Sequence, residues 1–156
     1  AERIGQCEKH DAGVSFYGVY YGQAALPHAP ERLFYIDNAV IRGLKVYNVE
    51  TSSDIPVYDL GAAAGRDPYE MFIGGARSII RITNPNAEKE RRLIVFRDSF
   101  GSSIAPLLTA GYSEITLVDI RYIAPSALGR LIDFTKADDA LFLYSASVIN
   151  NSGTIK

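Results

Sequence analysis

The chain has 156 residues, of which 47% are hydrophobic and 22% charged, as in one ordinary globular domain rather than a disordered or fibrous segment. Its net charge is −2 and it has no long run of Lys or Arg, which disfavours binding to nucleic acid or to an anionic membrane surface. The single cysteine excludes a disulfide within the chain. No Cys/His cluster has the spacing of a structural zinc site, and neither a metal nor a cofactor is expected.

The first half of the chain alternates extended and glycine-rich segments. Residues 15–26 fit either a short helix or an aromatic loop, because their periodicity favours neither. A short helix is expected at 68–72, with Asp67 as its N-cap and Pro68 at its first position. Strands are predicted at 33–36, 44–49, 55–58 and 78–82, and the third of these is limited to a sheet edge by Pro56.

From residue 93 onward the pattern becomes regular. Apolar strands are predicted at 93–96, 115–118 and 141–144, with helices at 102–110 and 125–136 between them. This β-α-β-α-β order predicts parallel strands that are buried on both faces and joined by right-handed crossovers. No internal repeat interrupts the chain, so residues 1–156 are expected to form one α/β domain.

A polar turn, Arg97-Asp98-Ser99-Phe100, follows the first strand of the regular half. Ligands of open parallel sheets gather at the carboxyl ends of the strands. A serine between a buried strand and a helix lies near free backbone N–H groups at the positive end of the helix, where an oxyanion can bind. Helix capping by Asp98 or Ser99 explains the same residues, and the local sequence alone favours capping. The turn is not a Gly-x-Ser-x-Gly nucleophile elbow.

A longer stretch around this turn resembles the second half of the DHHW family. The resemblance runs through residues 93–108 and 112–115 to Val118-Asp119-Ile120-Arg121-Tyr122, with further matches at 16–18, 69–75 and 141–144. The DHHW family is bacterial, similar to the alginate O-acetyltransferase domains and more distantly to SGNH hydrolases.

The resemblance implies a flavodoxin-like SGNH three-layer sandwich with a mainly parallel sheet. It implies that Ser99 is the nucleophile and attacks an acyl group, while a histidine from an upstream Asp-His-His-Trp block accepts the proton. Asp98 and Arg121 would support the serine loop or contact the substrate. Gly74 and Gly75 match a Gly-Gly element that would supply a backbone donor.

Two positions depart from the family pattern. Arg97 stands where glycine usually precedes Asp-Ser, which places bulk and charge next to the proposed site. Ala76 stands where the pattern has asparagine, so the usual side-chain donor to the oxyanion is absent. Loss of one such donor costs ~2.7–4 kcal/mol of transition-state stabilisation if no other group replaces it.

The histidines do not fit a complete catalytic site. Both of them, His10 and His28, precede Ser99, which excludes the common order with the nucleophile first and the histidine last. No Asp-His-His-Trp block is present and the chain lacks Trp. His10, beside Asp11 near the terminus, and His28, between prolines, are expected in surface loops. The chain begins at Ala1 without an initiator Met and looks like a piece of a longer protein, whose upstream segment would hold the base.

These features favour a serine O-acyltransferase or esterase that acts on a bacterial cell-surface polysaccharide through an acyl-serine intermediate. The expected partners are a carbohydrate, an acyl donor and a membrane-bound acyltransferase. The expected location is extracytoplasmic, with an anchor in a segment absent from this chain. Without its base, the chain alone should be nearly inactive. The alternatives are a non-catalytic carbohydrate-binding or assembly module that keeps the fold, or a structural domain of a secreted protein.

Overall fold

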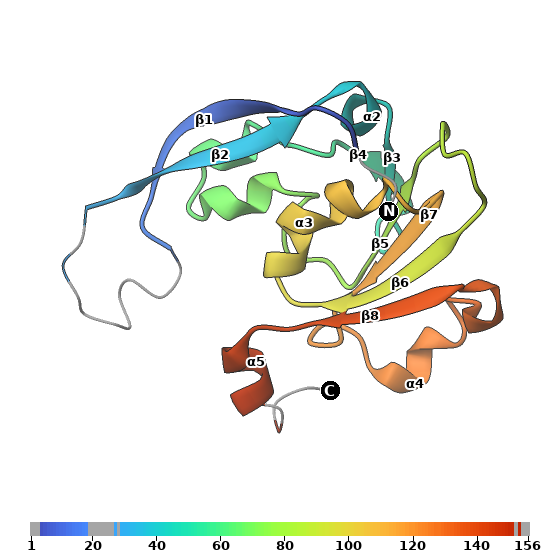
Figure 1. Cartoon of the computed structure of the whole chain (residues 1–156). Helices are drawn as coiled ribbons and strands as arrows, with labels where there is room; N and C mark the ends of the chain where they lie inside the picture. Colours follow the sequence, from blue (N-terminus) through green and yellow to red (C-terminus); the bar gives the residue numbers. More distant parts are fainter. Residues whose placement is uncertain (1–3, 19–26, 28, 152, 154–156) are drawn as a thin grey trace.

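In the computed structural model, which describes residues 4–18, 27, 29–151 and 153, the chain forms a six-stranded sheet and a separate two-stranded sheet (Figure 1). The small sheet is the antiparallel pair of β1 (Glu8–Phe16) and β2 (Glu31–Asp37). The large sheet has the spatial order β4 (Ser53–Ile55), β3 (Lys45–Asn48), β5 (Ile79–Thr83), β7 (Glu114–Val118), β6 (Arg92–Arg97) and β8 (Asp139–Leu143).

The large sheet is mixed, so the prediction of a mainly parallel sheet was wrong although the α/β class is confirmed. The parallel pairings are β6–β7 and β6–β8, whereas β3, β4 and β5 join the sheet through antiparallel pairings. The connections explain the difference: β3 and β4 are joined by a tight turn that contains Ser52 at φ 51°, and a tight turn can join only antiparallel strands. Parallel strands need the helical crossovers found in the second half.

Short helices lie between and after the strands of the two sheets. They are α2 (Ala39–Arg42), the 3-10 helices η1 (Ala62–Ala64), η2 (Pro68–Met71) and η3 (Phe134–Lys136), and the α-helices α3 (Phe100–Leu108), α4 (Pro125–Leu128) and α5 (Ala146–Asn150). Of these, η1 and η2 pack against the small sheet.

The helices α3 and α4 lie on opposite sides of the large sheet (Figure 1). Alternate residues of β6 point to these two faces, since Val95 packs with Ala105 of α3 and Ile94 packs with Leu128 of α4. The two faces of the sheet have separate hydrophobic cores. None of the described helices has the length and apolar character needed to cross a bilayer.

The predicted helix at 125–136 is much shorter in the structure. α4 ends at Leu128 because Gly129, a poor helix former, forms its C-cap. Asp133 then starts η3, where its carboxylate accepts a hydrogen bond from the Thr135 N–H at 3.1 Å. A local side-chain bond of this kind competes with continuation of the helix.

The first half also differs from the prediction in places. β1 was not predicted, and residues 15 and 16 of the ambiguous segment belong to its end, while 19–26 lie outside the described residues. The edge strand is β4, which ends before Pro56, and α2 and α5 were not expected. The predicted cap of the helix at 68–72 is confirmed, since Asp67 accepts a hydrogen bond from the Tyr69 N–H at 3.0 Å.

We expect replacement of Gly101 by alanine to destabilise the fold. A Cβ at this buried position of α3 would lie 2.6 Å from Cβ of Arg97, an atom that cannot move without the β6 backbone. Overpacking of this kind costs about 1–3 kcal/mol, which outweighs the higher helix propensity of alanine. The matched control is Gly129→Ala, where the new methyl group meets no atom within 4 Å. Denaturant unfolding of the two variants measures the difference, and an unchanged or increased stability of Gly101→Ala would contradict this packing.

Candidate functional site

Ser99 lies at the junction between β6 and α3. It occupies the N-cap position of α3 with helical dihedral angles, φ −58° and ψ −30°, and its side chain makes no capping hydrogen bond. The residue is exposed. Its hydroxyl group is therefore free for another role.

Asp98, by contrast, is buried and fully engaged. One carboxylate oxygen accepts a hydrogen bond from the Phe100 N–H at 3.0 Å, and the other accepts one from the Ser145 N–H at 2.7 Å. The first bond is the capping interaction that the sequence allowed for either residue, and the second ties the Ser99 loop to the end of β8. Capping thus explains Asp98 and leaves Ser99 unexplained.

The first backbone N–H groups of α3 are already hydrogen-bonded. Phe100 donates to the Asp98 carboxylate, Gly101 donates to the Asp98 carbonyl at 3.1 Å, and Ser102 donates to the Ser99 carbonyl at 3.1 Å. The expectation of free N–H groups along the first turn was therefore wrong. These three N–H groups are therefore not open to an oxyanion beside Ser99.

Ser99 opens onto a small cavity of about 160 Å³. Its lining residues are Asp67, Tyr69, Glu70, Gly75, Ala76, Ser99, Ser102, Arg121 and Tyr122. Three of the predicted site residues, Ser99, Gly75 and Arg121, thus meet at one cavity. Asp98 lies buried next to Ser99, and Gly74 is outside the lining set. Their catalytic roles stay predictions.

The Gly74-Gly75 element forms a left-handed turn. Its φ angles are 65° and 71°, and Ile73 before it has φ 51°, so glycine suits both positions. A Cβ on Gly75 would also lie 3.0 Å from Cγ of Glu70. The Gly75 N–H donates to the Phe72 carbonyl at 3.1 Å, and it is therefore not the free backbone donor that the resemblance implied.

Arg121 lines the cavity and is held there by the buried carboxylate of Asp119, which follows β7. Nε and Nη2 of Arg121 donate to the two carboxylate oxygens at 2.8 and 2.6 Å, a bidentate geometry that fixes the guanidinium plane. These hydrogen bonds raise the pKa of Arg121. Asp119 has no exposed surface, which strengthens its dependence on cationic partners.

Arg97 is the second cation beside Asp119. Its side chain is 1% exposed, and its Nη1 lies 3.6 Å from the Asp119 carboxylate and 3.3 Å from the Asp98 carbonyl. Burial lowers the pKa of Arg97, and the charge of Asp119 opposes this effect. Nε and Nη2 of Arg97 make no hydrogen bond. The side chain expected to crowd the site therefore points into the protein, behind the Ser99 loop, and does not line the cavity.

The histidines do not approach Ser99 in the described part of the chain. His10 lies in β1, where its ring stacks on Tyr35 with centroids 5.2 Å apart and its Nε2 is 3.6 Å from a carboxylate oxygen of Glu8. None of these three residues lines the Ser99 cavity. The surface turn predicted for His28 lies outside the described residues.

The sequence did not predict that η2 forms one wall of the cavity. The hydroxyl of Tyr69 donates to Oγ of Ser103 in α3 at 2.7 Å, and burial raises the pKa of Tyr69. The same helix brings Asp67 and Glu70 to the cavity. Residues 69–72 were part of the resemblance, but spacing alone gives no sign that this segment packs against α3.

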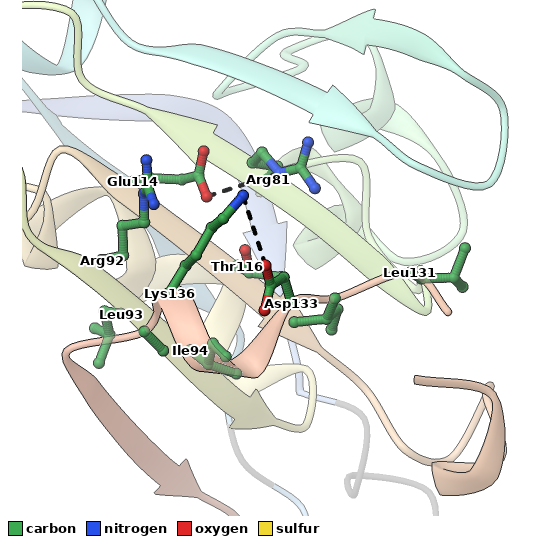
Figure 2. Close-up of a pocket in the computed structure, with 11 residues that line it drawn as sticks. Arg81, Arg92, Leu93, Ile94, Glu114, Thr116, Leu131, Asp133 and Lys136 are labelled. Atoms are coloured by element: carbon green, nitrogen blue, oxygen red, sulfur yellow. Dashed lines mark ion pairs between the residues drawn. The ribbon is translucent and has the colours of Figure 1, made fainter. Parts of the chain in front are cut away.

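A second hollow of about 290 Å³ lies on the α4 face of the sheet (Figure 2). Arg92 in its lining is the first residue of β6, so the hollow lies at the end of the strand opposite to Ser99. Its charged groups form ion pairs: Arg81 is 4.0 Å from Glu114, and Lys136 is 3.5 Å from Asp133 (Figure 2). No group of three or more His, Cys, Asp or Glu side chains in the described ranges is placed to hold a metal ion.

We expect Asp119→Asn to lower the free energy of unfolding by about 3–5 kcal/mol, because Arg97 would stay buried without a counter-ion. Arg97→Met should cost less. It removes the buried charge, and Asp119 keeps its bidentate partner Arg121. Denaturant unfolding of both variants gives the comparison. A larger loss in Arg97→Met than in Asp119→Asn would show that Arg97 does not depend on this carboxylate.

Comparison with known proteins gives a family and a fold. Residues 1–118 match the family described as DHHW protein. Among solved structures, Bacillus cereus PatB1 with a sulfonyl adduct is similar over 96% of this chain and 52% of its own, with a TM-score of 0.68 and 21% identity. A DHHW family protein from Eubacterium siraeum DSM 15702 is similar over 89% of this chain and 47% of its own, with a TM-score of 0.60 and 22% identity.

A second structure of Bacillus cereus PatB1 gives a TM-score of 0.65 at 19% identity, over 92% of this chain and 50% of that one. The chain therefore spans about half the length of these solved proteins. No curated protein matched it. The family match covers three quarters of the sequence, and the resemblance seen around Ser99 is confirmed: the chain belongs to the DHHW family and has a PatB1-like fold.

Proposed function

We propose that this protein is an SGNH-like serine O-acyltransferase or esterase that acts on a cell-surface carbohydrate through an acyl-Ser99 intermediate. The observation that carries the proposal is the state of the Ser99 hydroxyl. It is exposed at the junction of β6 and α3, opens onto a cavity, and is not used for helix capping. The placement of α3 and α4 on opposite faces of the sheet supports the flavodoxin-like three-layer arrangement of SGNH proteins.

The reaction would take two acyl-transfer steps. Oγ of Ser99 attacks the acyl carbonyl carbon and gives its proton to a base, while the carbonyl π electrons move to the oxygen. The oxyanion then collapses, the bond to the donor's leaving oxygen breaks, and that oxygen takes the proton from the base. A sugar hydroxyl or water then attacks the acyl-serine in the same way and restores the Ser99 hydroxyl.

The base would be a histidine imidazole outside these 156 residues. Among the described residues, no histidine lines the cavity beside Ser99. The solved proteins with this fold are about twice as long as this chain. A serine without such a base is a weak nucleophile. The proposal therefore assigns the nucleophile to this chain and its activation to an upstream segment, as the DHHW resemblance implies.

The walls of the cavity suit a carbohydrate. Tyr69 and Tyr122 offer aromatic surface, and the carboxylates of Asp67 and Glu70 can accept hydrogen bonds from sugar hydroxyl groups. A neighbouring hollow of about 580 Å³ shares Asp67 and Glu70 with it, which would give a chain of sugars room to extend. An extracytoplasmic location, with a membrane-bound acyltransferase as the source of acyl groups, follows from a substrate of this kind.

The first test uses a sulfonyl fluoride, since a sulfonyl adduct is known for PatB1. In the full-length protein we expect this probe to label Ser99 covalently, and Ser99→Ala to abolish both labelling and turnover of an acetyl ester. The matched control is Ser145→Ala, which removes a hydroxyl from the neighbouring loop whose backbone N–H binds Asp98. Mass spectrometry locates the adduct, and equal labelling or turnover with and without the Ser99 hydroxyl would overturn the proposal.

A second candidate function is a non-catalytic carbohydrate-binding module. The absence of a histidine beside Ser99 in the described residues favours it, as does the methyl side chain of Ala76 in the cavity. This function requires saccharide binding that is the same in wild type and Ser99→Ala, with no ester turnover. The two functions are thus separated by the same pair of proteins.

The second test concerns the base. The isolated 156-residue chain should turn over an acetyl ester at least 100-fold more slowly than the full-length protein, because general base catalysis contributes about 10²–10⁴-fold. His10→Ala should change neither rate, since His10 contacts Tyr35 and Glu8 and does not line the Ser99 cavity. Initial rates with a chromogenic acetyl ester give the comparison. Rapid turnover by the isolated chain that His10→Ala removes would make His10 the base.

A further inference from the structure

We propose that the hydroxyl of Ser102 is the side-chain donor to the oxyanion that forms when Ser99 attacks its acyl substrate. This inference rests on the proposed function and adds a catalytic residue to it. Ser102 lies on the first turn of α3 and lines the same cavity as Ser99. Residues three apart on a helix lie on one face, which places the two serines next to each other.

Ser102 differs from the other hydroxyl residues of α3 and its C-cap in its hydrogen bonding. Ser103 donates to the Phe100 carbonyl at 3.2 Å, and Thr109, at the C-cap, donates to the Pro106 carbonyl at 2.6 Å. This bond to the preceding turn is the usual way in which a helical hydroxyl is satisfied. Ser102 is 1% exposed, yet its Oγ has no hydrogen-bond partner. A buried hydroxyl without a partner is costly, and selection for stability alone does not account for it.

The other donors near Ser99 are limited. The N–H groups of Phe100, Gly101 and Ser102 bind within the loop and the helix, and that of Gly75 binds Phe72. Ala76 stands in the cavity where the family pattern has an amide side chain. A side-chain donor in this position is therefore of use to the oxyanion, and Ser102 is a lining residue whose hydroxyl has no hydrogen-bond partner.

In this reaction Ser102 would only donate a hydrogen bond. When the acyl carbonyl oxygen becomes negatively charged, it accepts a hydrogen bond from the Ser102 hydroxyl, and no proton is transferred. The hydroxyl turns about its Cα–Cβ bond to meet the oxygen within the cavity. Since the charge exists only in the transition state and the tetrahedral intermediate, the contact should raise kcat and leave KM nearly unchanged.

The test compares Ser102→Ala with wild type in the full-length protein. We expect kcat for an acetyl ester to fall by about 10²–10³-fold with KM within about twofold, the loss typical of one oxyanion donor. Because Ala removes an unsatisfied hydroxyl, the unfolding temperature should stay the same or rise. Ser102→Cys, which replaces the hydroxyl by a somewhat larger thiol that donates only weakly, should give an intermediate kcat.

The control is Thr109→Val, which removes a satisfied hydroxyl from the other end of the same helix and keeps the side-chain size. It should lower the unfolding temperature and change kcat little. If Ser102→Ala keeps the wild-type kcat while turnover still requires Ser99, Ser102 is not the donor and the proposed function stands. If Ser102→Ala loses stability and activity together, its role is structural and the inference fails. If turnover does not require Ser99, both proposals fail.

Discussion

Two guanidinium groups share the carboxylate of Asp119, which has no exposed surface at the end of β7. Arg121 holds it in a bidentate geometry from the cavity side, and Arg97 approaches it from within the protein. Without this carboxylate, Arg97 would be a buried charge with no ionic partner, and Arg121 would lose the contact that aims it at the cavity. The packing of α3 depends on the same cluster, because Gly101 leaves room for the Arg97 side chain.

Asp98 complements this cluster by joining two strand ends. Its carboxylate binds the first N–H of α3 and the Ser145 N–H beyond β8, while its carbonyl accepts from both Gly101 and Arg97. The carboxyl ends of the three parallel strands are therefore connected through two buried aspartates. This arrangement holds Ser99 in place without using the Ser99 side chain, and a nucleophile needs both a fixed position and a free hydroxyl.

The sequence predicted well wherever hydrophobic runs decide the structure. The three strands of the regular half and the junction at Ser99 follow from apolar segments separated by turn residues. Strand direction in the first half was not accessible, because a run such as 44–49 fits a parallel or an antiparallel neighbour equally well. The cavity wall was inaccessible for a related reason. Tyr69 and Glu70 reach Ser99 only through tertiary packing of η2, and residues about 30 positions apart carry no local signal of that contact.

Unsatisfied polar groups gather where the site is. Eight buried side-chain polar atoms lack a hydrogen bond among the described residues, and four of them belong to Arg97, Ser102 and Tyr144. Burial raises the pKa of Tyr144, and the charges of Asp119 and Asp98 act in the same direction. Proteins tolerate such groups chiefly where function needs them. Of these three residues, only Ser102 lines the Ser99 cavity, so its hydroxyl is the one unsatisfied group of the three that borders this space.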